Sequence, residues 1–125
     1  MSSILVVEDN PLNMKLLRDV LIHYGHRVLE ARTGLEGLDL AQRHRPDLIL
    51  MDIHLPDIDG ATALSRIRQQ RELDAVPVLA VSASVMPDEK QRVLSFGFDA
   101  FITKPLSLAV LLAEVDAALT TGRGR

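Results

Sequence analysis

The chain has 125 residues, a length that suits one compact domain. Apolar residues make up 47% and charged residues 25% of it, a balance typical of a globular protein and not of a disordered one. The formal net charge of -3 argues against a protein whose main task is to grip nucleic acid, because that task needs a concentrated basic face. We interpret the short basic groups as solvated helix faces. These groups contain Arg43, Arg45, Arg66, Arg68 and Arg71.

The residues that are missing also narrow the expected class of protein. The sequence contains no cysteine, which excludes disulfides, thiolate metal sites and cysteine nucleophiles, and fits a reducing cytoplasm. It shows no charged leader before a hydrophobic run and no apolar stretch of about eighteen residues, the length of a membrane span. We therefore expect a cytoplasmic protein without membrane insertion, present as a monomer or weak dimer.

Short apolar runs alternate five times with longer segments of helical periodicity. The runs expected to form strands are residues 4–7, 28–29, 48–51, 78–81 and 101–103. Helix starts are indicated by Pro11, by a capping box formed by Thr33 and Glu36, by Gly60, by Pro87 and by Ser107. Five strand-then-helix units joined by short loops predict a parallel sheet with helices on both faces. Residues 120–125 are expected to form a flexible tail.

In such a sheet, functional residues lie at the carboxyl ends of the strands. Glu8 and Asp9 follow the first strand, Asp52 the third, Ser82 the fourth and Lys104 the fifth. Neighbouring strands lie roughly 5 Å apart, so these side chains should reach one another. A single Asp, Ser or Lys after a strand is more often a helix cap or a solvated side chain. The prediction of a functional site therefore depends on all five residues following matched strand ends.

The chemistry of this group points to phosphoryl transfer. Carboxylates 4 Å apart repel by about 4 kcal/mol per pair at an effective dielectric of 20, so positive charge must offset them. Lys104 supplies one charge, and the oxygen ligands suit Mg²⁺ (or Mn²⁺). Asp52 could attack a phosphoryl group in line while the metal and Lys104 neutralise its oxygens and Ser82 donates a hydrogen bond to it. Asp57 and Asp59, in the loop that follows, are interpreted as helix caps or turn formers.

The motifs at these strand ends resemble those of one known family. They are Val7-Glu8-Asp9-Asn10, Pro46-Asp47-Leu48-Ile49-Leu50-Met51-Asp52, Leu55-Pro56 with Gly60, Ser82-Ala83 and Lys104-Pro105. With them the chain resembles, from end to end, the receiver domain of bacterial response regulators. The resemblance implies a single receiver domain over residues 1–125. Its fold would be α/β, a doubly wound five-stranded parallel sheet of strand order 2-1-3-4-5 in a flavodoxin-like three-layer sandwich.

The resemblance also implies a ligand set for the cation. Asp52 would be the phospho-acceptor, and Asp9, Asp52 and the backbone carbonyl of His54 would bind Mg²⁺ directly. Glu8 would act mainly through a metal-bound water. Lys104 corresponds to the lysine of the family motif, and its bond to Pro105 is expected to be cis.

Further positions of the family motif concern switching and the lifetime of the phosphoryl group. Ser82 takes the place of the switch Ser or Thr, and Phe101 that of the aromatic switch residue. Phe101 as a plain core residue is an equal alternative. His54 and Ser84 occupy positions that tune loss of the phosphoryl group, although His54 also fits a solvated rim residue.

The implied function is that of a phospho-accepting response regulator in a two-component or phosphorelay system. A histidine kinase or histidine phosphotransfer protein would be the donor, and downstream proteins would bind the face formed by the fourth helix, fifth strand and fifth helix. We expect no nucleic acid partner and no DNA-binding output domain. The chain would not be an enzyme on external substrates, because it would catalyse only its own phosphorylation and dephosphorylation. Residues 8–16 are similar to those of single-domain regulators of the DivK type, and similar segments also occur in receivers fused to hybrid kinases.

Three rival functions fit the sequence less well. An Asp-nucleophile phosphatase would carry a second Asp two residues after Asp52, where this chain has His54. A flavodoxin-like cofactor module would need a Ser/Thr/Gly-rich phosphate loop after the first strand, where residues 8–11 are acidic and end in proline. A receiver used only for docking, without phosphorylation, would not need the complete acidic set.

Overall fold

The computed structural model describes residues 2–82, 87–104 and 106–121, which form alternating strands and helices. The strands are β1 (Ser3–Val7), β2 (Arg27–Ala31), β3 (Leu48–Asp52), β4 (Val78–Ser82) and β5 (Ala100–Thr103). The helices are α1 (Pro11–His23), α2 (Gly34–His44), α3 (Gly60–Arg68), α4 (Pro87–Ser95) and α5 (Leu108–Thr121), with a 3-10 turn η1 at Arg71–Leu73. All strand pairs are parallel, in the order β2-β1-β3-β4-β5, which confirms the predicted fold.

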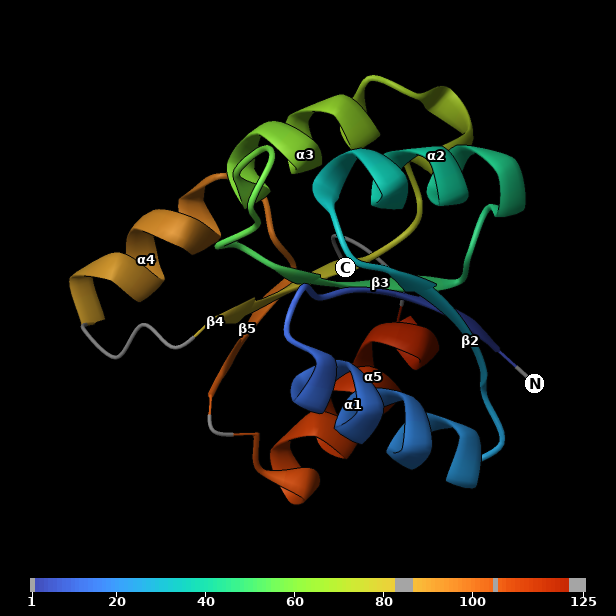
Figure 1. Ribbon diagram of the computed structural model, residues 1–125. Helices are drawn as coiled ribbons and strands as arrows, with labels where there is room; N and C mark the ends of the chain where they lie inside the picture. The colour runs from blue at the N-terminus through green and yellow to red at the C-terminus, as the bar shows by residue number, and fades with distance from the viewer. Residues whose placement is uncertain (1, 83–86, 105, 122–125) are drawn as a thin grey trace.

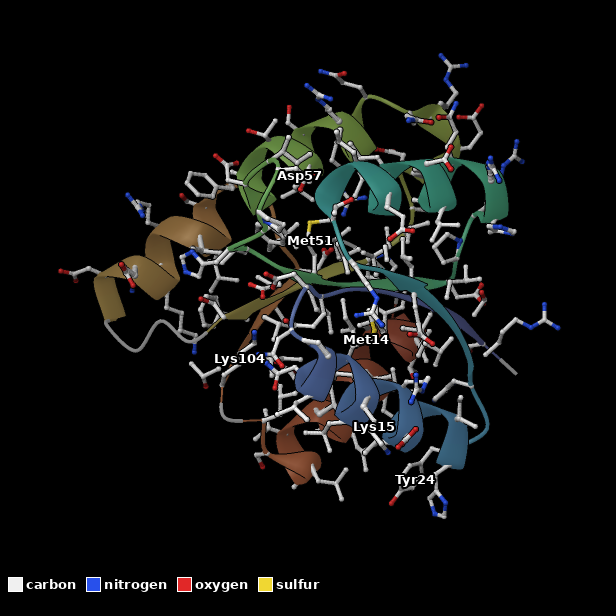
Figure 2. All side chains as sticks on the ribbon, viewed as in Figure 1. Met14, Lys15, Tyr24, Met51, Asp57 and Lys104 are labelled. Carbon is white, nitrogen blue, oxygen red and sulfur yellow. The ribbon has the colours of Figure 1, made fainter. Side chains whose placement is uncertain are left out.

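The sheet separates two apolar layers, and each layer is covered by its own set of helices. Figure 1 shows α2 and α3 over one face and α1 and α5 over the other. Successive strand residues point to opposite faces, so Leu50 packs with the α1 and α5 layer and Met51 with the α2 and α3 layer. Met14 of α1 and Met51 of β3 lie on opposite sides of the sheet (Figure 2). Every residue of β3 is buried, which explains why its sequence is a continuous apolar run that ends in Asp52.

The start of α2 corrects one detail of the predicted capping box. Thr33 is the N-cap as predicted, and its hydroxyl accepts a hydrogen bond from the Glu36 N–H at 3.1 Å. The Glu36 carboxylate, however, accepts from the N–H of Arg32 at 2.7 Å and not from the N–H of Thr33. The side chain therefore reaches one residue further back than a capping box requires.

One member of the predicted solvated basic groups is instead largely buried. Arg43 and its partner Asp39 are exposed, as predicted for a solvated helix face. The side chain of Arg68, by contrast, is 15% exposed and pairs with Asp99 at 3.3 Å. Its guanidinium also donates to the carbonyl oxygens of Leu73 and Val76, at 3.1 and 2.8 Å. The prediction for Arg68 was wrong because the end of η1 and the segments that lead into β4 and β5 supply its partners.

Helix α5 continues through Thr120 and Thr121, which the sequence placed in a flexible tail. The remaining residues of that predicted tail, 122–125, lie outside the described part of the chain. Among the helices within residues 2–82, 87–104 and 106–121, none has the length and apolar character needed to cross a membrane.

Candidate functional site

The carboxyl edge of the sheet brings the predicted site residues together. Glu8 directly follows β1, whose last residue Val7 pairs with Met51, so Glu8 stands beside Asp52. On the other side, Asp52 pairs with Val81 of β4, and Ser82 is the next residue along that strand. Glu8, Asp52 and Ser82 are 1%, 4% and 0% exposed. The site therefore has a floor of buried polar side chains, which is uncommon unless they are paired or bind a ligand.

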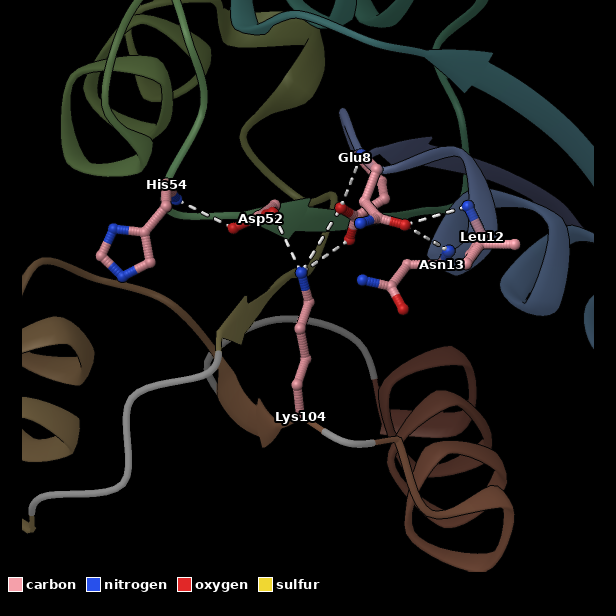
Figure 3. A network of polar contacts seen from close by, with 7 residues as sticks. Glu8, Leu12, Asn13, Asp52, His54 and Lys104 are labelled. Atoms are coloured by element: carbon pink, nitrogen blue, oxygen red, sulfur yellow. Dashed lines mark hydrogen bonds and ion pairs between the residues drawn. The ribbon is translucent and has the colours of Figure 1, made fainter.

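Lys104 extends from the end of β5 across this floor and joins two of the carboxylates. Its Nζ lies 3.1 Å from Oδ2 of Asp52 and 3.1 Å from Oε1 of Glu8 (Figure 3). The Lys104 N–H donates to the carbonyl oxygen of Ser82 at 2.8 Å, which fixes the base of the side chain against β4. The predicted convergence of Glu8, Asp52 and Lys104 is present in the structure.

The electrostatics of the site follow from burial and from this pairing. Burial raises the pKa of Glu8 above its ordinary value of 4.5, and the nearby charge of Asp52 raises it further, against the lowering effect of the Asn10 N–H and of Lys104. For Lys104, burial favours the neutral form, but the hydrogen bonds to Asp52 and Glu8 outweigh it and raise the pKa. Lys104 is therefore a charged ammonium at neutral pH, whereas the surroundings of Glu8 disfavour its ionised form.

The acidic residues fit a divalent cation by geometry and by ligand type. Glu8, Asp9 and Asp52 each offer a carboxylate oxygen, and these oxygens lie within 4.8 Å of one another. The buried Oε1 of Glu8 accepts no hydrogen bond from the described residues, although it lies within ion-pair distance of Lys104. Oxygen ligands with this much negative charge suit a hard cation such as Mg²⁺. Asp9 is exposed, so the group is open to solvent on that side.

His54 lies at the rim of this site and orients the central carboxylate. Its N–H donates to Oδ1 of Asp52 at 2.8 Å, while its side chain is exposed and points away from Lys104 (Figure 3). Asp52 therefore has one oxygen held by a backbone N–H and the other by an ammonium. The predicted metal contact of the His54 carbonyl remains a prediction.

The two predicted switch residues are both buried. Ser82 is fully buried at the end of β4, and Phe101 is 6% exposed within the layer covered by α2 and α3. The position of Phe101 agrees with the core alternative, and its proposed switching stays a prediction. The predictions for Ser84 and for a cis bond at Pro105 concern residues outside the described part of the chain.

Two contributions to the site were not predicted. The Asn10 N–H donates to Oε2 of Glu8 at 3.1 Å, and the Asn10 side chain caps α1. The Asn-Pro pair before a helix was a signal for this cap, whereas its contact with Glu8 was not visible in the sequence. Asp57 accepts hydrogen bonds from the N–H groups of Gly34 and Leu35 at the start of α2, so it acts as a helix cap as interpreted from the sequence, but the helix that it caps was not predicted. Asp59 caps α3 through the Thr62 N–H, as predicted.

A doubly wound sheet of this strand order, with carboxylates and a lysine at its carboxyl edge, defines the receiver class of signalling domain. Residues 4–116 match the family described as response regulator receiver domain. The polar-differentiation response regulator DivK of Brucella anthropi is 43% identical over 117 residues, which cover 94% of this chain and 95% of that relative. The chain belongs to the response regulator receiver family.

Solved structures of receivers agree with this assignment. The chemotaxis response regulator CheY4 of Vibrio cholerae superposes with a TM-score of 0.89 at 27% identity, covering 95% of this chain and 99% of that one. The receiver domain of a sensor histidine kinase from Pseudomonas aeruginosa has a TM-score of 0.89 at 32% identity, covering 96% and 98%. That structure has a magnesium ion coordinated in its active site cleft.

Proposed function

We propose that this receiver accepts a phosphoryl group on Asp52 from a histidine kinase or histidine phosphotransfer protein. The observation that carries the proposal is the placement of the buried Asp52 carboxylate, with the Lys104 ammonium 3.1 Å from one of its oxygens and Glu8 on the same ammonium. Asp9 adds a third carboxylate, and oxygens of the three carboxylates lie within 4.8 Å of one another, an arrangement suited to phosphoryl transfer. A cytoplasmic location is part of the proposal.

In the proposed reaction, a carboxylate oxygen of Asp52 forms a bond to phosphorus while the bond from phosphorus to the donor imidazole nitrogen breaks. The electron pair of the broken bond stays on that nitrogen. Asp52 can attack in a fixed orientation because the His54 N–H and Lys104 hold its two oxygens. Lys104 then places positive charge against the transferred oxygens, and later hydrolysis of the acyl phosphate by water restores the carboxylate. The chain would thus act only on its own Asp52 and not as an enzyme on external substrates.

The acidic group would hold Mg²⁺ or Mn²⁺ through Glu8, Asp9, Asp52 and the backbone carbonyl of His54. The cation, when bound, supplies stabilisation of the negative charge on the phosphoryl oxygens. This assignment is supported by the proximity of the carboxylate oxygens and by the buried Oε1 of Glu8.

The proposed output is a change in protein contacts. Phosphorylation would replace the single negative charge of the Asp52 carboxylate by a phosphoryl group of about -1.5 to -2, and Ser82 would move toward the new oxygens to donate a hydrogen bond. Phe101 would then shift and alter the face formed by α4, β5 and α5, where downstream proteins would bind. To change the ratio of active to inactive conformation from 1:99 to 99:1, phosphorylation must favour the active conformation by about 5.5 kcal/mol. Charge-assisted hydrogen bonds to the phosphoryl group would supply a part of this free energy. The output of this receiver would be an intermolecular contact without DNA binding.

The test is intact-mass spectrometry after incubation with acetyl phosphate, or NMR with beryllofluoride, each with and without Mg²⁺. Wild type should gain a Mg²⁺-dependent adduct, and Asp52→Asn should gain none because the amide cannot form the acyl phosphate. Asp39→Asn is the matched control, since this exposed aspartate lies on α2 away from the strand ends. Equal labelling of wild type and Asp52→Asn would refute the assignment of Asp52.

A further inference from the structure

We infer that Asp57 is a positioning residue for the proposed cation site, because it ties the loop that carries His54 to the start of α2. This inference rests on the proposed function and adds a residue to the machinery of that site. The loop, residues 53–59, connects β3 to α3 and will be called the β3–α3 loop.

The contact is bidentate and spans a long stretch of sequence. Oδ1 of Asp57 accepts the N–H of Gly34 at 2.8 Å, and Oδ2 accepts the N–H of Leu35 at 2.8 Å. Next to it, Ile58 packs so closely on α2 that a methyl group at Gly34 would lie 2.5 Å from its Cγ1. The β3–α3 loop therefore rests on α2 through one charged and one apolar contact.

The base of the β3–α3 loop is held by other elements. At its beginning the Ile53 N–H donates to the carbonyl oxygen of Val81 at 3.2 Å, and at its end the Gly60 N–H donates to the carbonyl oxygen of Ile53 at 3.2 Å. Asp59 is committed to the cap of α3. These contacts fix where the loop leaves β3 and enters α3, whereas Asp57 fixes its middle, three residues after His54.

Asp57 is more than a helix cap, because α2 already has one. The Thr33 hydroxyl accepts a hydrogen bond from the N–H of Glu36, and the Thr33 carbonyl oxygen accepts one from the N–H of Gly37. The Asp57 carboxylate accepts hydrogen bonds from the N–H groups of Gly34 and Leu35, which also belong to the first turn. The helix dipole favours a negative charge at this end of α2. The hydrogen bond from Leu35, together with that from Gly34, lowers the pKa of Asp57, so the carboxylate is charged at neutral pH.

Loss of the Asp57 contact should act on cation binding more than on the transfer step. The middle of the β3–α3 loop would gain freedom, and the His54 carbonyl would have to be ordered when the cation binds. Removing a residue that orients a metal ligand typically weakens binding 10- to 100-fold, and for this indirect contact we expect the low end, about tenfold. The maximal rate at saturating Mg²⁺ should change by less than about twofold, because Asp52 and Lys104 are untouched.

The experiment compares Asp57→Ala and Asp57→Asn with Thr33→Ala. Thr33→Ala removes a hydrogen bond from the same first turn of α2 but leaves the β3–α3 loop contact intact, so it controls for helix stability. Mg²⁺ affinity is measured by NMR amide shifts without any phosphodonor, and thermal unfolding is recorded for every variant. The half-saturating Mg²⁺ concentration for labelling by acetyl phosphate is measured separately.

The expected result is weaker Mg²⁺ binding in Asp57→Ala, an intermediate loss in Asp57→Asn, and wild-type affinity in Thr33→Ala at a similar loss of thermal stability. Unchanged affinity in Asp57→Ala, or an equal loss in Thr33→Ala, would overturn the inference. If wild type binds Mg²⁺ but takes no label, the proposed function fails while the affinity ratio still decides the role of Asp57.

Discussion

The substitution Arg68→Ala is expected to destabilise the protein, although the local sequence pattern predicts a solvated helix face for this residue. Its guanidinium donates to the carbonyl oxygens of Leu73 and Val76 and pairs with Asp99. These contacts tie the end of α3 to η1 and to the segment that leads into β4. Asp99 in turn accepts the N–H of Val78 at 2.8 Å, which links the starts of β4 and β5.

The magnitude follows from the hydrogen bonds that would be lost. A hydrogen bond to a charged group contributes about 1.5 kcal/mol at the lower end of the usual range, so the two shortest bonds together give about 3 kcal/mol. Breaking a buried ion pair by removing one partner costs a similar 3–5 kcal/mol or so. The Arg68 side chain is 15% exposed, so solvent screening reduces this value only modestly. For a domain of this size, about 3 kcal/mol lowers Tm by about 10 °C.

The assay is urea and thermal unfolding of Arg68→Ala beside Arg66→Ala. Arg66 lies on the same helix and is exposed, so its removal should change the free energy of unfolding by less than about 0.5 kcal/mol. Arg68→Lys should recover part of the loss, because one ammonium cannot serve both carbonyl oxygens and Asp99 with the geometry of a guanidinium. If Arg68→Ala and Arg66→Ala have the same free energy of unfolding and the same Tm, the hydrogen bonds of Arg68 contribute nothing measurable to stability and the expectation is refuted.

Two more substitutions test the packing and the electrostatics around the site. Gly37→Ala would place a methyl group 2.7 Å from Cγ2 of Val7, where α2 crosses β1. We expect a loss of about 1–3 kcal/mol in urea unfolding, and no loss would show that α2 can shift without cost. Glu8→Gln tests the raised pKa of Glu8. Because the pKa of Glu8 is raised in the folded state, its contribution to stability is fully present below the ordinary value of 4.5 and is lost as pH rises through the folded pKa. Gln cannot ionise. In metal-free buffer, the free energy of unfolding of Glu8→Gln should therefore increase relative to that of wild type as pH rises. A constant difference between about pH 4 and pH 8 would contradict this.

The fold and the central site residues could be predicted because both follow from short-range patterns. A strand buried on both faces must be apolar along its whole length, so the run before Asp52 identified β3 without knowledge of its neighbours. Once the sheet was predicted to be parallel, Glu8, Asp52 and Lys104 had to meet at one edge. Their ion pairs at 3.1 Å are the result of that topology.

Two of the contacts that escaped prediction join residues far apart in the chain. Asp57 binds N–H groups 22 and 23 residues away, and Arg68 pairs with a residue 31 positions later. An exposed aspartate in a loop and an arginine near a helix end look alike whether or not such a partner exists. Their roles depend on how α2, α3 and β4 are placed in space, which no local pattern specifies.

The charge of the site would link the proposed cation binding to the proposed phosphorylation. Three carboxylates, those of Glu8, Asp9 and Asp52, meet one ammonium from Lys104, so the cluster has an excess of negative charge even with every ion pair formed. A phosphoryl group on Asp52 would bring about -1.5 to -2 charge in place of the single charge of the carboxylate, so the excess would grow. If a divalent cation makes that addition more favourable by some factor, then phosphorylation must tighten cation binding by the same factor, because the coupling free energy is shared by both equilibria. The raised pKa of Glu8 belongs to the same balance, since a proton on Glu8 and a bound cation would offset the same excess negative charge.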